Sequence, residues 1–283
     1  MPHDVKVNAF CFWTGSPQFE GVRSARTFLA GALVFGAMLP GIFLTPIAAA
    51  QSISPVTMSD PGAGAAENMP VLAKIVKMAN FGQQPSTPES QKLADWVVDS
   101  SDNNRLPFAI VDKVNARVFV FDAQGQLKGA AVVLLGLAVG DDSVPGIGQR
   151  KLSSIRPEER TTPAGRFVAS LERDIHGQEV LWVDYDTAVS LHPVVKGTPK
   201  ERRAERLASP SPLDKRISYG CINVPVSFYE KVVSPTFTGT NGIVYVLPET
   251  RPAREVFGSY DVQDLLRKQA SADTGQSSRS AAR

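Results

Sequence analysis

Cysteine is scarce in this sequence. The 283 residues contain two cysteines, Cys11 and Cys221. Cys11 lies in an N-terminal segment that we expect to be removed, which leaves one cysteine in the mature chain. In an exported protein, a single remaining thiol is either an intermolecular bridge or a nucleophile.

The chain also lacks a charge excess of either sign. Its formal net charge is +2, and removing residues 1–50, with three basic and two acidic residues, leaves +1. Such a balance argues against a general nucleic-acid binder. We therefore expect no nucleic-acid partner. No internal repeat is evident either.

A long uninterrupted apolar run is missing as well. Residues 27–50 carry no charge, but Pro40 and Pro46 interrupt them, and the segment ends in Ala48-Ala49-Ala50. Arg23 and Arg26 precede it. A basic start, an apolar middle and a small-residue end are typical of a secretory signal peptide, which we place at residues 1–50. The alternative is an uncleaved anchor, which would be the chain's only contact with a membrane.

The rest of the chain divides into three parts. Residues 51–84 read as a linker, with a short helix near 71–79, and residues 251–283 as a polar, disordered tail. Between them, residues 85–250 form one mainly β domain, a sandwich or partly closed barrel with a few short helices. The expected strands are 108–112, 117–122, 127–139 (one long strand or a bent pair), 165–171, 180–184, 188–192 and 242–247. The expected helices are 88–100, which Thr87 can cap and which has proline at its first position, 200–207 and 228–233.

His192 and Cys221 are the candidate catalytic pair. A thiol must lose its proton before it attacks a carbonyl, so it needs a nearby base and a group that orients that base. The mature chain has two histidines. His176 falls in a turn and reads as a solvated loop residue, whereas His192 ends an apolar strand. The carbonyl of Pro193 can hold the other ring nitrogen of His192. A buried core histidine remains the alternative.

The residues around Cys221 offer further polar groups. The backbone N–H groups of Gly220 and Cys221 could stabilise an oxyanion. Ser218 and Tyr219 offer hydroxyl donors, and Asn223 can fix the turn or contact substrate. For each of these side chains a purely turn-forming role stays open.

These residues, in this order, resemble the L,D-transpeptidases with a YkuD-type catalytic domain. That family's pattern is a histidine, a spacer, Ser/Thr-His-Gly-Cys, a hydrophobic residue and then Asn or Arg. A Thr-Pro-x-Gly segment precedes a strand in the family, and residues 162–165 match it here, before the expected strand. The resemblance covers roughly residues 108–247.

The resemblance implies a mostly β, YkuD-like domain in the periplasm that acts on peptidoglycan stem peptides. Cys221 would attack the third stem residue and release D-alanine, with His192 as the base. A stem amine would then give a 3→3 cross-link, and water would give hydrolysis; an outer-membrane protein is another possible acceptor. The resemblance implies neither a metal nor an organic cofactor, and suggests roles in cell-wall biogenesis and cell shape.

The sequence departs from the family pattern in three places. Tyr219 replaces the usual histidine, Pro193 follows the base, and 25 residues separate His192 from Ser218. The long segment 196–216 carries seven basic and three acidic residues. It could border the cleft, with Arg216 contacting a substrate carboxylate, or it could be a solvated surface loop.

Three other functions remain open at this point. A sortase-like transpeptidase also places His before Cys and could use Arg251, but sortases lack the Ser-x-Gly-Cys and Thr-Pro-x-Gly features that this sequence carries. A catalytically impaired peptidoglycan-binding envelope protein would fit the change at Tyr219. A disulfide-linked dimer through Cys221 is the third.

Overall fold

The computed structural model of the protein describes residues 75–281, with side chains to residue 271. The expected signal peptide, most of the expected linker and residues 71–74 of the expected linker helix lie outside this range. Residues 75–79 are not helical. Within residues 75–281, no helix combines the length and the apolar character that crossing a membrane requires.

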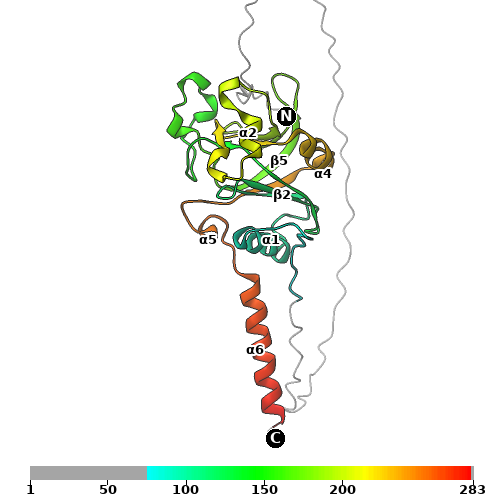
Figure 1. The fold of residues 1–283 in the computed structure, drawn as a ribbon. Helices are drawn as coiled ribbons and strands as arrows, with labels where there is room; N and C mark the ends of the chain where they lie inside the picture. The colour runs from blue at the N-terminus through cyan, green and yellow to red at the C-terminus, as the bar shows by residue number, and fades with distance from the viewer. Residues whose placement is uncertain (1–74, 282–283) are drawn as a thin grey trace, which may run out of the picture. The chain divides into compact units, whose positions relative to one another are not determined.

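An eight-stranded sheet forms the centre of the domain (Figure 1). Its strand order is β3-β2-β1-β10-β5-β6-β7-β9, and β4 pairs separately with β8. Most neighbours are antiparallel, but β1–β10 and β7–β9 are parallel. The strands are β1 Phe108–Asp112, β2 Arg117–Phe121, β3 Leu127–Val132, β4 Leu135–Gly136, β5 Gly165–Arg173, β6 Glu179–Asp184, β7 Val189–Pro193, β8 Arg216–Ser218, β9 Ile222–Val224 and β10 Gly242–Val246.

The two edges of this sheet meet at one point. Leu134, just beyond β3, exchanges both backbone hydrogen bonds with Asn223 of β9, at 2.8 and 2.9 Å. This single antiparallel bridge nearly closes the sheet, which confirms the mainly β, partly closed architecture predicted from the sequence. The long strand expected at 127–139 is a bent pair, β3 and β4.

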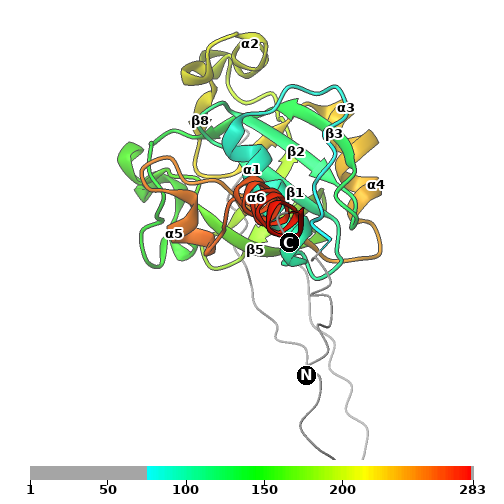
Figure 2. The same cartoon turned by 90° about the horizontal axis from the view of Figure 1, so that it is seen from below.

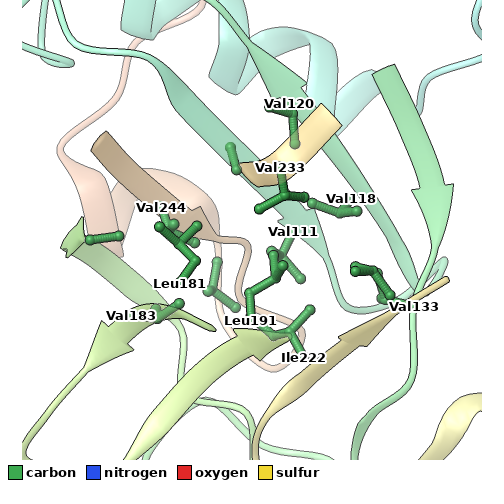
Figure 3. Packing of buried hydrophobic residues seen from close by; sticks show 14 of the residues in the cluster. Val111, Val118, Val120, Val133, Leu181, Val183, Leu191, Ile222, Val233 and Val244 are labelled. Atoms are coloured by element: carbon green, nitrogen blue, oxygen red, sulfur yellow. The ribbon is translucent and has the colours of Figure 1, made fainter. Parts of the chain in front are cut away.

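Alternation along the strands fills two separate cores. Val111, Val118, Leu191, Ile222 and Val244 belong to the first, inside the nearly closed sheet (Figure 3). Their strand neighbours point to the opposite face, because successive side chains alternate across a strand. Strands β1 and β10 are therefore buried on both faces.

Helix α1, Pro88–Ser100, covers the second core. Leu93, Trp96 and Val97 pack there against Phe108 and Tyr245. The Thr87 hydroxyl accepts from the N–H of Ser90 and caps the helix, with proline at the first helical position, as the sequence predicted. Helix α6 begins beside α1 (Figure 1), and Figure 2 looks along α6 from its C-terminal end.

The remaining helices are short, apart from α6. They are α2 Arg203–Ala208, α3 Val226–Phe228, the π-helix Tyr229–Val233, α4 Ser234–Phe237, α5 Ala253–Phe257 and α6 Val262–Ala281. Single 3-10 turns occupy Ile147–Gln149, Leu152–Ser154, Pro157–Glu159, Pro199–Glu201 and Pro212–Lys215.

The structure differs from the sequence prediction at both ends of the domain. Phe81, in the expected linker, packs edge-on against Phe119 and Phe121. The segment expected to be a disordered tail contains α5 and α6, and Val262 there is 1% exposed. A few apolar side chains are enough to dock these segments, although their average composition is polar.

A buried ionic cluster joins the loops above the first core. The ammonium group of Lys113 donates to Asp141, at 2.8 Å, and lies 3.4 Å from Glu249; both Lys113 and Asp141 side chains are fully buried. Arg216 completes the cluster by pairing with Glu249. Burial alone would raise the pKa of Asp141, but hydrogen bonds from Lys113 and from residues 249–250 outweigh it and hold that pKa below its usual value.

We expect Lys113→Met to destabilise the fold by about 3–5 kcal/mol at pH 7, because it leaves a buried carboxylate without its cation. Urea denaturation measures this loss. The depressed pKa of Asp141 stabilises the native state above the ordinary carboxyl pKa, about 3.9, and this contribution fades as the pH falls below it. The difference in unfolding free energy between the variant and the wild type should therefore shrink toward pH 3.

Lys92→Met is the control, because the Lys92–Asp261 pair is exposed and should contribute at most about 1 kcal/mol. Equal effects of the two substitutions would contradict this interpretation.

Candidate active site

Two neighbouring strands bring the predicted catalytic residues together. Strands β7 and β9 run parallel, with His192 opposite Asn223 and Leu191 opposite Ile222. Leu191 and Ile222 point into the first core. Alternation then places Ser190, His192, Cys221 and Asn223 on the other face. His192 lies one same-face position along from Cys221, about 7 Å by the strand rise.

The sulfur of Cys221 is enclosed by the β7 backbone. The backbone N–H of Ser190 donates to it at 3.4 Å, the Ser190 hydroxyl lies 3.7 Å away, and the carbonyl of Ala188 also lies at 3.7 Å. Cys221 is 3% exposed. The nucleophilic form of Cys221 is the thiolate of the reduced residue.

Both ring nitrogens of His192 have hydrogen-bond partners. Nδ1 lies 2.8 Å from the carbonyl of Pro193, the contact expected from the sequence, and Nε2 lies 3.0 Å from the amide nitrogen of Asn223. Because a carbonyl only accepts, Nδ1 carries the proton. His192 is fully buried. Burial lowers the pKa of His192 to about 4, so the imidazole is neutral at pH 7 and able to accept a proton at Nε2.

The turn before Cys221 is held by Ser218 and Thr162. The Ser218 hydroxyl donates to the carbonyl of Cys221 at 2.6 Å and accepts from the N–H of Gly220 at 3.1 Å. In this state the Gly220 N–H, expected to stabilise an oxyanion, is used by the turn. Gly220 has φ +136°, and a Cβ there would lie 2.9 Å from the carbonyl oxygen of Thr161. Glycine is therefore required at this position.

Tyr219 lies under a cation. The guanidinium of Arg160 sits 3.9 Å above the centre of the half-buried Tyr219 ring, a geometry that stabilises by cation–π attraction. At the family's histidine position this chain thus places an aromatic ring with an arginine on it. A protonated imidazole would be repelled there.

A narrow cavity adjoins Cys221. Its volume is about 20 Å³, enough for one water but not for a peptide. Residues of the loop between β4 and β5 cover it, and the turn between β6 and β7 completes the wall. The lining residues are Ile147, Gly148, Arg150, Leu152, Ile155, Thr187, Ala188, Tyr219 and Cys221.

Arg216 and His176 contact other groups. Arg216, expected to contact substrate, is held by Glu249 and by the carbonyls of Lys113 and Ala138. These contacts favour a structural role for its guanidinium. His176 is exposed in the β5–β6 turn, where its backbone N–H donates to Asp174. Among residues 75–271, no three His, Cys, Asp or Glu side chains form a metal site.

Two contributors escaped the sequence reasoning. Ser190 lies two residues before His192, so the period of two along a strand was a signal for it. Arg203 lies in the basic segment, and its Nη1 donates to Asn223 Oδ1 at 2.6 Å. The basic segment 196–216 contains seven basic residues, and no local pattern distinguishes Arg203 from Arg216 as the one that reaches the site.

Comparison with known proteins finds similarity among solved structures. The catalytic domain of an Enterococcus faecium L,D-transpeptidase is 19% identical; the match covers 50% of this chain and 96% of that one, with a TM-score of 0.29. The helical cell shape determining protein Pgp2 of Campylobacter jejuni is 14% identical over 52% of this chain and 49% of its own, with a TM-score of 0.35. An L,D-transpeptidase of Mycobacterium smegmatis is 14% identical over 50% and 58%, with a TM-score of 0.30. No family model and no curated protein matches the chain.

We expect Thr162→Val to destabilise the protein by about 1–3 kcal/mol, because it leaves a buried N–H without an acceptor. The Thr162 hydroxyl accepts from the N–H of Gly136 at 2.9 Å and donates to the carbonyl of Gly220 at 2.8 Å. Thermal and urea unfolding measure the loss. Thr162→Ser keeps the hydroxyl and should recover most of it. Equal stability of the Val and Ser variants would mean that this hydroxyl does not hold the turn.

Proposed function

We propose that this protein is an exported cysteine acyltransferase that acts on peptidoglycan stem peptides, an L,D-transpeptidase. One observation supports this above all: a neutral, oriented histidine and a cysteine share one face of two adjacent strands, inside the Ser-x-Gly-Cys motif. A thiol that shares a face with a neutral imidazole is suited to acyl transfer. The peptide substrate and the periplasmic location follow from the motif resemblance and from the leader in the sequence.

The proposed reaction begins with reduced Cys221. Its proton passes to Nε2 of His192, and the thiolate attacks the carbonyl of the third stem residue. Collapse of the tetrahedral intermediate breaks the amide bond, and the His192 proton goes to the departing nitrogen of D-alanine. The amine of a second stem peptide then attacks the thioester and restores the thiol, which forms a 3→3 cross-link. Water in its place gives hydrolysis, and an amine of an outer-membrane protein would give attachment of that protein.

Substrate entry requires movement of the covering loop. A cavity of about 20 Å³ beside a sulfur that is 3% exposed cannot admit a peptide. The loop that carries Ile147 and Leu152 must therefore move away from the β6–β7 turn. A covered site of this kind keeps out bulk water, which reduces hydrolysis of the thioester in favour of transfer.

The second candidate is a peptidoglycan-binding envelope protein with impaired catalysis. Two observations favour it: Asn223 occupies the Nε2 lone pair of His192, and Cys221 is nearly fully covered. Such a protein would bind muropeptides without changing them.

Mass spectrometry of muropeptides separates the two functions. We expect the mature, reduced protein, residues 51–283, to release D-alanine from tetrapeptide stems and to form dimers. Cys221→Ala should abolish both products, and His192→Gln should lower turnover at least about a hundredfold, a typical contribution of general base catalysis. Both variants should still bind muropeptides in calorimetry. Binding by wild type with no product and no carbapenem adduct on Cys221 would establish the second candidate instead.

Tyr219→His tests the departure from the family motif. A neutral imidazole can stack under Arg160 as tyrosine does, so we expect turnover to be kept at pH 7. Because Arg160 disfavours a second positive charge, activity should fall as this imidazole gains a proton at low pH. The measurement is the rate of D-alanine release between pH 5 and 8. An inactive but folded Tyr219→His variant would contradict this role of the position.

A further inference from the structure

The basic segment 196–216 delivers one arginine to the catalytic base. Arg203, in α2, has a side chain that is 10% exposed, whereas its neighbour Arg202 is 67% exposed. The Arg203 Nη1 donates to Oδ1 of Asn223 at 2.6 Å, and the Asn223 amide nitrogen lies 3.0 Å from Nε2 of His192. A continuous chain of three side chains therefore runs from the segment to the base.

The chemistry of these groups fixes the direction of every hydrogen bond. An arginine only donates, so the oxygen of the Asn223 amide must face Arg203. The NH2 group of Asn223 then faces His192 and donates to Nε2. That nitrogen must carry a lone pair, and the ring proton resides on Nδ1, which donates to Pro193. Arg203 thus fixes the Asn223 amide so that its NH2 group faces Nε2, which supports the tautomer that the Pro193 carbonyl sets.

The segment holds Arg203 firmly in place. Glu201 accepts from Arg203 Nε at 2.8 Å. Gly197, at φ +62°, leaves room for this pair, because a Cβ there would lie 1.9 Å from the Glu201 carboxylate. Lys215, 2% exposed, donates to the carbonyls of Arg206, Leu207 and Ser209, which end α2. Fixed contacts of this kind orient a functional group more precisely than a solvated loop does.

Opposing charges act on His192 from different elements. Besides the dominant effect of burial, Arg203 lowers the pKa of His192, whereas the bond to Pro193 and the charge of Asp174, in the β5–β6 turn, raise it. The Cys221 sulfur lies on the same face, from the residue just before β9. Arg203 is thus the cation whose removal most directly changes the proton affinity of the base.

We propose that Arg203 is a positioning residue that acts through Asn223 and holds His192 in its neutral, Nδ1-protonated form, with the lone pair on Nε2. Its catalytic meaning rests on the proposed function. When the Cys221 proton moves to Nε2, the bond from Asn223 to that atom must break, since both sides would then be donors. Arg203 therefore sets how readily the base accepts the proton.

An NMR titration of the mature, reduced protein tests this without any activity. The mature chain has two histidines, and exposed His176 serves as the internal reference. Arg203→Met should increase the proton affinity of His192 at least about tenfold, one pKa unit, and Arg203→Lys should restore most of the wild-type value. Asn223→Asp should increase the proton affinity of His192 by more than Arg203→Met does, because a carboxylate replaces the NH2 donor. Arg202→Met, a neighbouring arginine paired with Glu205 at the surface, should leave His192 unchanged.

The outcomes separate this proposal from the proposed function. An unchanged His192 pKa in folded Arg203→Met and Asn223→Asp would overturn the positioning role. A raised pKa in a protein that never releases D-alanine would support the positioning role and refute the enzyme. In an active protein, Arg203→Met should raise the pH at which kcat/KM falls on the acidic side, in parallel with the pKa of His192. A change in KM alone, with no shift of this pH, would mean that Arg203 binds substrate instead.

Discussion

The parallel pairing of β7 with β9 is the constraint on which the site depends. Thirty-one positions separate His192 from Asn223 in the chain, yet the register sets them opposite each other. The same register places Ser190 against Cys221. A shift of β9 by one residue would turn Ile222 out of the first core, and a shift of β7 would turn Leu191 out and send His192 into it. The hydrophobic core therefore enforces the geometry of the polar face.

The closure of the sheet supports this pairing. Strand β9 has three residues and would be a weak edge by itself. The backbone bridge between Leu134 and Asn223 gives it a partner on its other side. The buried ions add a second support, since Lys113 binds the carbonyl of Thr162, and the Thr162 hydroxyl binds that of Gly220. The turn that presents Cys221 is thus tied to the ionic cluster through one residue.

Burial defines the electrostatics of the site. Enclosed by loops on the face opposite the core, His192 stays neutral because a buried imidazolium would lose its hydration. The low dielectric also strengthens the effect of each fixed charge. Arg203, which reaches the His192 ring only through Asn223, can therefore influence the proton affinity of that ring. The same enclosure means that opening and chemistry are separate steps in the proposed reaction.

The sequence by itself determined the local elements and the reactive residues. A short apolar run marked the strand Phe108–Asp112, and the cap at Thr87 marked the start of α1, because both signals are local. Scarcity of cysteine and histidine singled out Cys221 and His192, and the proline carbonyl beside the base was foreseeable from its neighbour alone. Tertiary structure decided which arginine matters. Arg216 is nearest to the motif in sequence, but it serves the ionic cluster, while α2 carries Arg203 to Asn223. Tertiary structure also decided that the tail contains docked helices and that Tyr219 lies under Arg160. Each of these contacts joins segments far apart in the chain, and no local pattern encodes such a distance.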